Sequence, residues 1–330
     1  YSKAKFNFLP NSIGFGLDMN RQRRTEQSRF LDFASPVVRD FTANRTINFS
    51  WKFVEGGFLN PLLDYNFVTR STLVKFESTE DGRQRTGSEL AKSIFFKDGA
   101  AINFGDDINH SQNVTLNLTP QLPNVASINK YFKITGQYVV DYQWTNPLQP
   151  DQSLRDISKQ ASYNSSTRFT GTLNLKQLGD TWFKVTKPSI TRITPVDTNL
   201  TVLDEIGNIF KFIFLDFETV RLALNQTNAS VNPGVYGETG INNFWGLGGS
   251  TLANGPSLPY QLGLVSSPHG GFKTVSSSSF PFFGFSSFGG LRPPNGIMQD
   301  NFNQSTTLDI STSRPLWKGA QLDLKWNSTV

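Results

Sequence analysis

Few side chains in this chain of 330 residues have the type and spacing that catalysis requires. The two histidines, His110 and His269, lie far apart in the sequence, and neither has a nearby serine or carboxylate pattern typical of a triad or a metal site. Cysteine is absent, which excludes thiolate nucleophiles, disulfides and cysteine-ligated metals. We therefore expect no catalytic residue, no metal site and no cofactor, and we predict that the chain is not an enzyme.

The acidic and glycine-rich clusters also lack the spacing of known ligand-binding motifs. Glu77, Glu80 and Asp81 do not follow the pattern of a calcium loop. The stretches GLGGS (246–250) and FGFSSFGG (283–290) lack the lysine and hydroxyl residue that end a phosphate-binding loop. The formal net charge of +5 is modest and scattered, so we expect no nucleic-acid partner.

The elements that would position any site are β-strands. The clearest is 42–53, TANRTINFSWKF, where apolar and polar side chains alternate, and 131–145 repeats the pattern. Successive side chains of a strand point to opposite faces, so each segment has one apolar and one polar face. The residues predicted on the apolar, lipid-facing side are Phe49, Trp51, Phe132, Ile134, Tyr138, Val140 and Tyr142.

Weaker copies of this alternation bring the predicted strand count to nine. They lie at 13–19, 63–67, 114–118, 169–175, 220–224, 308–310 and 322–326. No run of eighteen apolar residues exists, which excludes a transmembrane helix but not a transmembrane strand.

The links between these strands alternate in length. Short links at 55–62, 120–128 and 315–319 alternate with long ones at 21–41, 79–110, 147–160 and 228–300. Outer-membrane barrels have tight periplasmic turns and long extracellular loops. We therefore predict an all-β fold, an antiparallel transmembrane β-barrel segment of about nine strands, located in the bacterial outer membrane.

The chain divides into three parts on this interpretation. Residues 1–176 hold strands one to six, and 212–330 hold strands seven to nine. Residues 177–211 form an excursion on the short-turn, periplasmic side, where Thr201 could cap a short helix over 202–211. A poorly packed linker is the alternative for this excursion.

The longest loop, 228–300, is rich in glycine, serine and phenylalanine. It is too apolar for ordinary disorder and too broken for a helix, so it should pack against the barrel or form a partner or substrate surface. Its candidate contact residues are Phe280, Phe282, Phe283, Phe285 and Phe288. The basic cluster Arg21, Arg23 and Arg24 is either a solvated loop tip or a site for lipopolysaccharide phosphates or an acidic partner.

Three segments resemble a known family: FNFLPNSIGFGLDMNRQ (6–22), FTANRTINFSWKF (41–53) and DNFNQSTTLDISTSRPLWKGAQLDLKWN (300–327). They are similar to the SprA/Sov family, the outer-membrane translocons of the Bacteroidetes type 9 secretion system. Members of that family are very large single-chain barrels, so the resemblance implies that this chain is a section of one. The resemblance implies no catalytic residues for this chain.

The resemblance implies export of folded cargo proteins to the cell surface. It also implies four kinds of partner: the remainder of the same barrel, a PorV-type barrel protein at a lateral opening, a periplasmic plug protein, and the cargo, with lipid and lipopolysaccharide around the wall. Two alternatives stay open. One is a soluble or surface-anchored β-sandwich module for binding or adhesion, and the other is a small-solute porin or receptor barrel.

Overall fold

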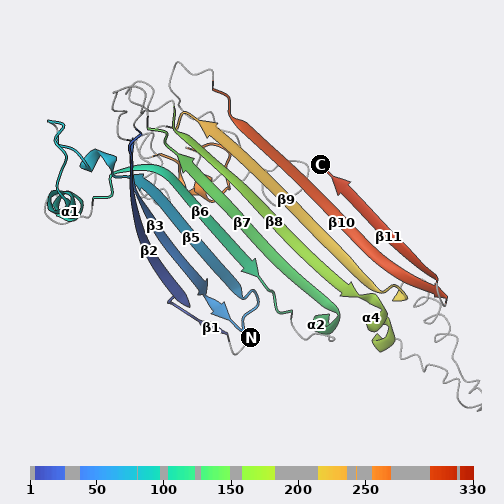
Figure 1. Cartoon of the computed structure of the whole chain (residues 1–330). Coiled ribbons are helices and arrows are strands. Elements are labelled where there is room, and N and C mark those ends of the chain that lie inside the picture. Colours follow the sequence, from blue (N-terminus) through green and yellow to red (C-terminus); the bar gives the residue numbers. More distant parts are fainter. Residues whose placement is uncertain are drawn as a thin grey trace, which may run out of the picture.

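The computed structural model describes residues 4–26, 38–79, 81–96, 103–122, 128–148, 158–182, 215–235, 243, 255–268, 298–317 and 320–330. Nine long strands form one antiparallel sheet in the order β11-β10-β9-β8-β7-β6-β5-β3-β2 (Figure 1). The predicted all-β class and the predicted count of nine strands are therefore confirmed. This sheet is open, because within the described residues its outer strands β2 and β11 each pair on one side only.

Each long strand pairs with its neighbours along the chain. The strands of the sheet are β2 (Ser12–Arg24), β3 (Val38–Lys52), β5 (Pro61–Thr72), β6 (Asp106–Leu118), β7 (Phe132–Thr145), β8 (Gln160–Asn174), β9 (Thr219–Pro233), β10 (Asn301–Trp317) and β11 (Ala320–Thr329). A small second sheet pairs β1 (Lys5–Phe6) with β4 (Val54–Glu55). The helices described are short: η1 (Val74–Phe76), α1 (Gly87–Phe95), α2 (Ile128–Tyr131), α4 (Leu175–Trp182) and α6 (Leu258–Gln261).

Several strands extend into segments that the sequence predicted as long loops. β2 continues to Arg24 and β9 to Pro233, while β3 already begins at Val38 and β6 at Asp106. The predicted loop 228–300 therefore begins only after Pro233. The polar residues that end the sequence alternation remain in regular ladders, because main-chain pairing does not depend on side-chain polarity.

The excursion predicted at 177–211 is described only at its start. Helix α4 begins at Leu175, which the alternation had assigned to the preceding strand. The helix predicted over 202–211 lies outside the described residues.

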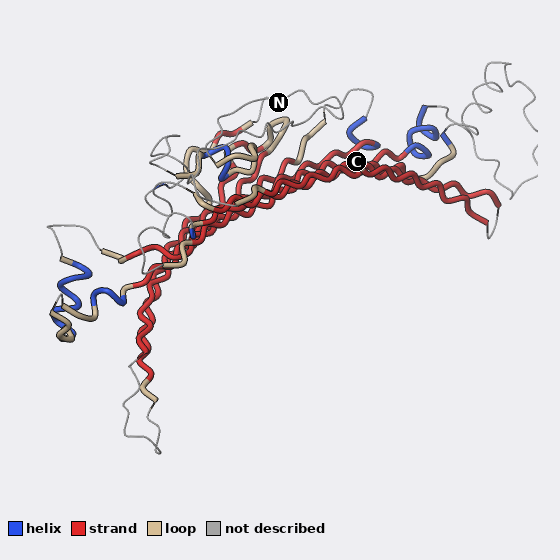
Figure 2. Tube along the Cα trace, turned by 90° about the horizontal axis from the view of Figure 1, so that it is seen from above, coloured by secondary structure: helices blue, strands red, loops and turns tan. Residues whose placement is uncertain are grey.

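The sheet bends into an arch when it is viewed from above. The small β1–β4 sheet and the described loops and helices that pack on the large sheet lie on its convex side (Figure 2). Trp51 on β3 meets this layer, since its indole Nε1 donates to the main-chain oxygen of Asn7 at 2.9 Å. The face that carries Trp51 is therefore the convex face.

Candidate functional site

The seven residues predicted to face lipid all lie on the convex face. The register places Phe49 opposite Tyr65, and the pairing continues through Val114 and Val140, so these positions share one face. Trp51 follows two residues after Phe49, and the remaining four, Phe132, Ile134, Tyr138 and Tyr142, lie at even positions of β7 like Val140. The alternation therefore assigned the apolar face consistently across strands far apart in sequence.

Not all seven are open to the surroundings. Val140 and Tyr142 are 0% and 2% exposed because residues 255–268 cover them. Tyr138 donates its hydroxyl to the main-chain oxygen of Leu262 in the same segment. Phe132 and Ile134 lie outside this covered cluster and are partly exposed.

All aromatic side chains that the structure describes within the nine strands lie on this convex face. Examples at opposite edges of the sheet are Phe15 on β2 and Trp326 on β11. The concave face has amides and hydroxyls instead. One row of directly paired residues crosses seven strands of that face: Asn48, Asn66, Asn113, Asp141, Asn164, Ala229 and Asn303.

Charges on the concave face nearly cancel. In the nine strands the seven basic residues on this face are Arg24, Lys52, Arg70, Lys133, Arg168, Arg221 and Lys325, and the seven acidic ones are Asp18, Asp40, Asp64, Asp106, Asp141, Asp309 and Asp323. Several acids also accept hydrogen bonds from neutral neighbours, such as Asp64 from the Ser50 hydroxyl at 2.6 Å. Within the described strands, the result is a polar surface with little net charge and no aromatic patch.

The convex face divides into an uncovered apolar band and a covered region that holds both apolar and polar side chains. The band lies towards the short turns, and several of its side chains remain open: Phe15 is 78% exposed, Leu222 43% and Leu324 43%. Apolar side chains that are exposed on β2 and on β9 to β11, and partly exposed on the strands between them, indicate a contact with something other than water.

The apolar band runs obliquely across the strands. The register aligns Phe15 of β2 with Ser230 of β9, six strand steps away, whereas the band on β9 is centred on Leu222. At about 3.3 Å per residue and about 4.8 Å between strands, the band shifts about 26 Å over about 29 Å. This is a slant of about 42°, within the roughly 35–45° tilt of strands in transmembrane barrels.

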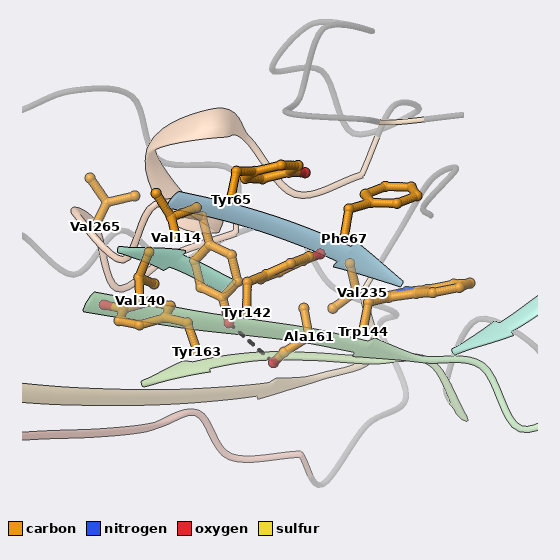
Figure 3. Packing of buried hydrophobic residues seen from close by; sticks show 11 residues of the cluster. Tyr65, Phe67, Val114, Val140, Tyr142, Trp144, Ala161, Tyr163, Val235 and Val265 are labelled. Carbon is orange, nitrogen blue, oxygen red and sulfur yellow. Dashed lines mark hydrogen bonds between the residues drawn. The ribbon is translucent and has the colours of Figure 1, made fainter. Parts of the chain in front are cut away.

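Above the band on β6 to β9, residues 255–268 cover the convex face. Tyr260 is fully buried, and its hydroxyl contacts Asn232 Oδ1 at 2.6 Å and the Ala161 oxygen at 3.1 Å. Its ring packs edge-on against Tyr163, with centroids 5.1 Å apart. Tyr260 belongs to a buried cluster on the convex face. Figure 3 shows strand residues of this cluster, such as Tyr142 and Tyr163, together with Val235 and Val265.

The covering segment also satisfies polar strand residues. Ser230 donates to the Ser266 oxygen at 3.1 Å, and Gln112 donates to Gln261 Oε1 at 2.9 Å. The long loop therefore packs over its own sheet in this part, as one of the sequence alternatives predicted. Phe280, Phe282, Phe283, Phe285 and Phe288 lie outside the described residues.

A second loop covers the convex face above the band on β2 to β5. Phe41 and Ala43 of β3 pack there with Phe76 and with Leu90 and Ile94 of α1. The other members of this cluster are Leu73, Met19, Val74 and Phe104. Both described coverings therefore lie outside the arch, away from the concave face.

The basic cluster is only partly a solvated tip. Arg21 and Arg23 point to the convex face, where Arg21 Nε lies 2.5 Å from Glu77 Oε1 and Arg23 lies 3.7 Å from Oε2. Arg24 points to the opposite face and pairs with Glu26 at 2.5 Å. The three arginines therefore lie on two faces of the sheet, which their closeness in the sequence did not reveal.

The described residues hold no arrangement suited to catalysis. The His110 ring nitrogens contact the Thr69 hydroxyl at 2.8 Å and the Gln112 amide at 2.7 Å, an uncharged network beneath the covering loop. In the parts of the chain that the structure describes, no three histidine or acidic side chains gather as metal ligands would. Nor is any helix there long and apolar enough to cross a membrane.

No protein-family model matches this chain, and no curated protein matches it. Function is therefore inferred from the two faces of the sheet. Among the residues that matter there, sequence reasoning missed Tyr260, Gln261 and Arg39, which lie in or beside predicted loops. Tyr260 and Gln261 have only a weak sequence signal, as aromatic and polar side chains in a segment without Lys, Arg, Asp or Glu, and Arg39 is one of many charged residues in its segment.

Proposed function

We propose that the chain forms a section of the wall of a large outer-membrane β-barrel that conducts folded proteins to the cell surface. The observation that carries this proposal is the slanted apolar band on the convex face, opposite a concave face of amides and hydroxyls. A soluble sandwich buries its apolar face against a second sheet, which gives no reason for the band to lie oblique to the strands. A level bilayer around tilted strands gives that reason directly.

The two ends of the strands support one orientation. Four long links and both covering loops lie at one end of the sheet, while the turns at 55–60 and 119–122 lie at the other, together with one long link, 175–218. We assign the covered end to the cell exterior and the short turns to the periplasm, because outer-membrane barrels have this asymmetry. The covered polar residues, such as Ser230 and Asn232, then stand above the membrane.

The open edges of the sheet support a larger assembly. In lipid, an unpaired strand edge leaves main-chain groups without hydrogen bonds, at a cost of several kcal/mol each. Edges at β2 and β11 therefore require further strands, which we assign to the remainder of the same barrel. The PorV-type partner, the plug protein and the cargo follow only from the family resemblance.

Transport through this wall involves no bond making or breaking. The near-neutral concave lining offers a passing protein neither a strong field nor an apolar surface to adhere to, so passage depends on lumen width and on gating by partners. The near balance of charge on this lining agrees with cargo of varied composition.

The test is fractionation of native cells followed by sizing of the intact species. We expect the polypeptide in the outer-membrane fraction, resistant to carbonate, and released by mild detergent as a particle far heavier than 36.9 kDa. A monodisperse soluble protein of that mass would instead favour a binding module. A detergent-dependent particle of that mass alone would favour a small porin.

A further inference from the structure

We propose that Arg21, Arg23 and Arg39 form a binding site for the phosphate groups of glycolipid in the outer leaflet. This inference rests on the proposed function, because it needs the apolar band to lie in a bilayer. It goes beyond that function by assigning a ligand class to three named side chains.

The first observation is their place on the sheet. On β2 the exposed residues of the band end at Leu17. Met19 packs under the second covering loop, and the next outward-pointing residues along the strand are Arg21 and Arg23. Arg39 lies directly opposite Arg23 on β3. At about 3.3 Å per residue, Arg21, Arg23 and Arg39 lie about 13–20 Å beyond Leu17 along the strand. A tilt of about 42° makes this about 10–15 Å along the membrane normal, from where long arginine side chains can extend towards the headgroups that border the apolar layer.

The second observation is their charge balance. Like charges directly opposite one another in a ladder destabilise the pair unless an acid lies between them. Here one carboxylate, Glu77, serves three guanidinium groups. The nearest acids on the same strands, Asp18 and Asp40, point to the concave face, so among the described residues the outward cluster keeps an excess of two positive charges.

The third observation is that Glu77 leaves two of the arginines loosely engaged. Arg23 and Arg39 lie 3.7 Å from Glu77 Oε2, beyond a normal hydrogen bond, and among the described residues this buried oxygen has no hydrogen-bond partner. The side chains of Arg21, Arg23 and Arg39 are 35%, 39% and 24% exposed. Their planar donor groups can therefore reach an external phosphate and match its oxygens in pairs.

Native mass spectrometry of the purified full-length protein in detergent tests this site. The probe is a phosphorylated lipid A-type glycolipid, compared with the same lipid after phosphatase treatment and with inorganic phosphate. The variant is R23Q with R39Q. R24Q is the matched control, since Arg24 is the next residue on β2 but points to the concave face.

We expect the double variant to bind the phosphorylated glycolipid on the order of tenfold more weakly than the native protein does. R24Q should bind it like the native protein. We also expect weak binding of the phosphatase-treated lipid. Equal retention by the double variant, or an equal loss in R24Q, would overturn the site. Equal competition by inorganic phosphate would overturn glycolipid as the source.

A folding defect is separated by the unfolding midpoint of each variant and by R23K with R39K. The lysine variant keeps the charge and should recover part of the lipid binding while R23Q with R39Q does not. Cell fractionation tests the proposed function separately: if that function is wrong, the protein will not be found in the membrane fraction. A membrane protein without glycolipid retention would refute only the arginine site.

Discussion

Arg221 and Leu222 are consecutive residues of β9 whose exposed side chains point to opposite faces of the sheet. Leu222 belongs to the apolar band on the convex face, and Arg221 lies on the concave face opposite Thr172 and Ser311. The same division extends across all nine strands. Neighbouring residues of one strand can therefore report on two different environments.

Leu222→Arg should strongly impair the assembled protein. An arginine on the lipid face near the bilayer centre costs about 2–4 kcal/mol, less towards the interfaces. Urea unfolding of the detergent-extracted protein measures the loss. Ala223→Arg, one residue further on the concave face, should cost less than about 1 kcal/mol. Equal tolerance of both substitutions would argue against a lipid-facing band.

Tyr260→Ala should release the covering segment from the outer wall. The substitution removes a fully buried ring together with hydrogen bonds to Asn232 and Ala161, at a cost of about 3–5 kcal/mol. Tyr260→Phe removes only the hydroxyl contacts and should cost about 1–2 kcal/mol. Proteolysis of intact cells should cut within 255–268 fastest in the alanine variant.

Thr227→Ala is a suitable control for this experiment, because Thr227 is exposed on the concave face of β9. It should leave the cleavage rate unchanged. An unchanged rate in Tyr260→Ala as well would show that the segment is held by other contacts.

Helix α1 should keep its N-terminal cap in acid. The guanidinium of Arg83 donates to Glu89 at 2.8 Å and the Thr86 amide donates to it at 2.8 Å, which lowers the pKa of Glu89 from 4.5 to about 2. A lowered pKa stabilises the folded form above pH 4.5, and this contribution is lost as the pH falls towards about 2.

Hydrogen exchange of the α1 amides, corrected for intrinsic rates, measures this loss. Protection should hold at pH 4.5 and decline as the pH approaches 2. Glu89→Gln cannot titrate, so its protection should not decline with acid in this range. A decline centred at pH 4.5 in the native protein would contradict the arrangement of the cap.

The strands with the cleanest alternation could be predicted because their two faces meet different surroundings along most of their length. β3 and β7 are the examples, with Phe49 and Asn48 as neighbours on opposite faces. The apolar face of each strand followed from period two, whereas their place in one sheet was predicted from the alternating lengths of the links.

The ends of strands that lie next to the long links, as on β9, could not be predicted in this way. On β9 the outward residues Asn228, Ser230 and Asn232 are polar, so the alternation ends although the ladder continues. Their hydrogen-bond partners come from elsewhere, such as the Ser266 oxygen for Ser230. The contact of Arg21 with Glu77 joins residues 56 positions apart, which local sequence spacing does not reveal.

The most direct test of the proposed wall is thiol labelling of single cysteines in the cysteine-free sequence. Arg221→Cys and Leu222→Cys would be introduced separately into the protein in native membranes and treated with a charged, water-soluble maleimide. We expect Arg221→Cys to react readily from the lumen and Leu222→Cys to remain unmodified until detergent removes the lipid. Rapid labelling of both residues in intact membranes would contradict the proposal that the convex face lies in a bilayer.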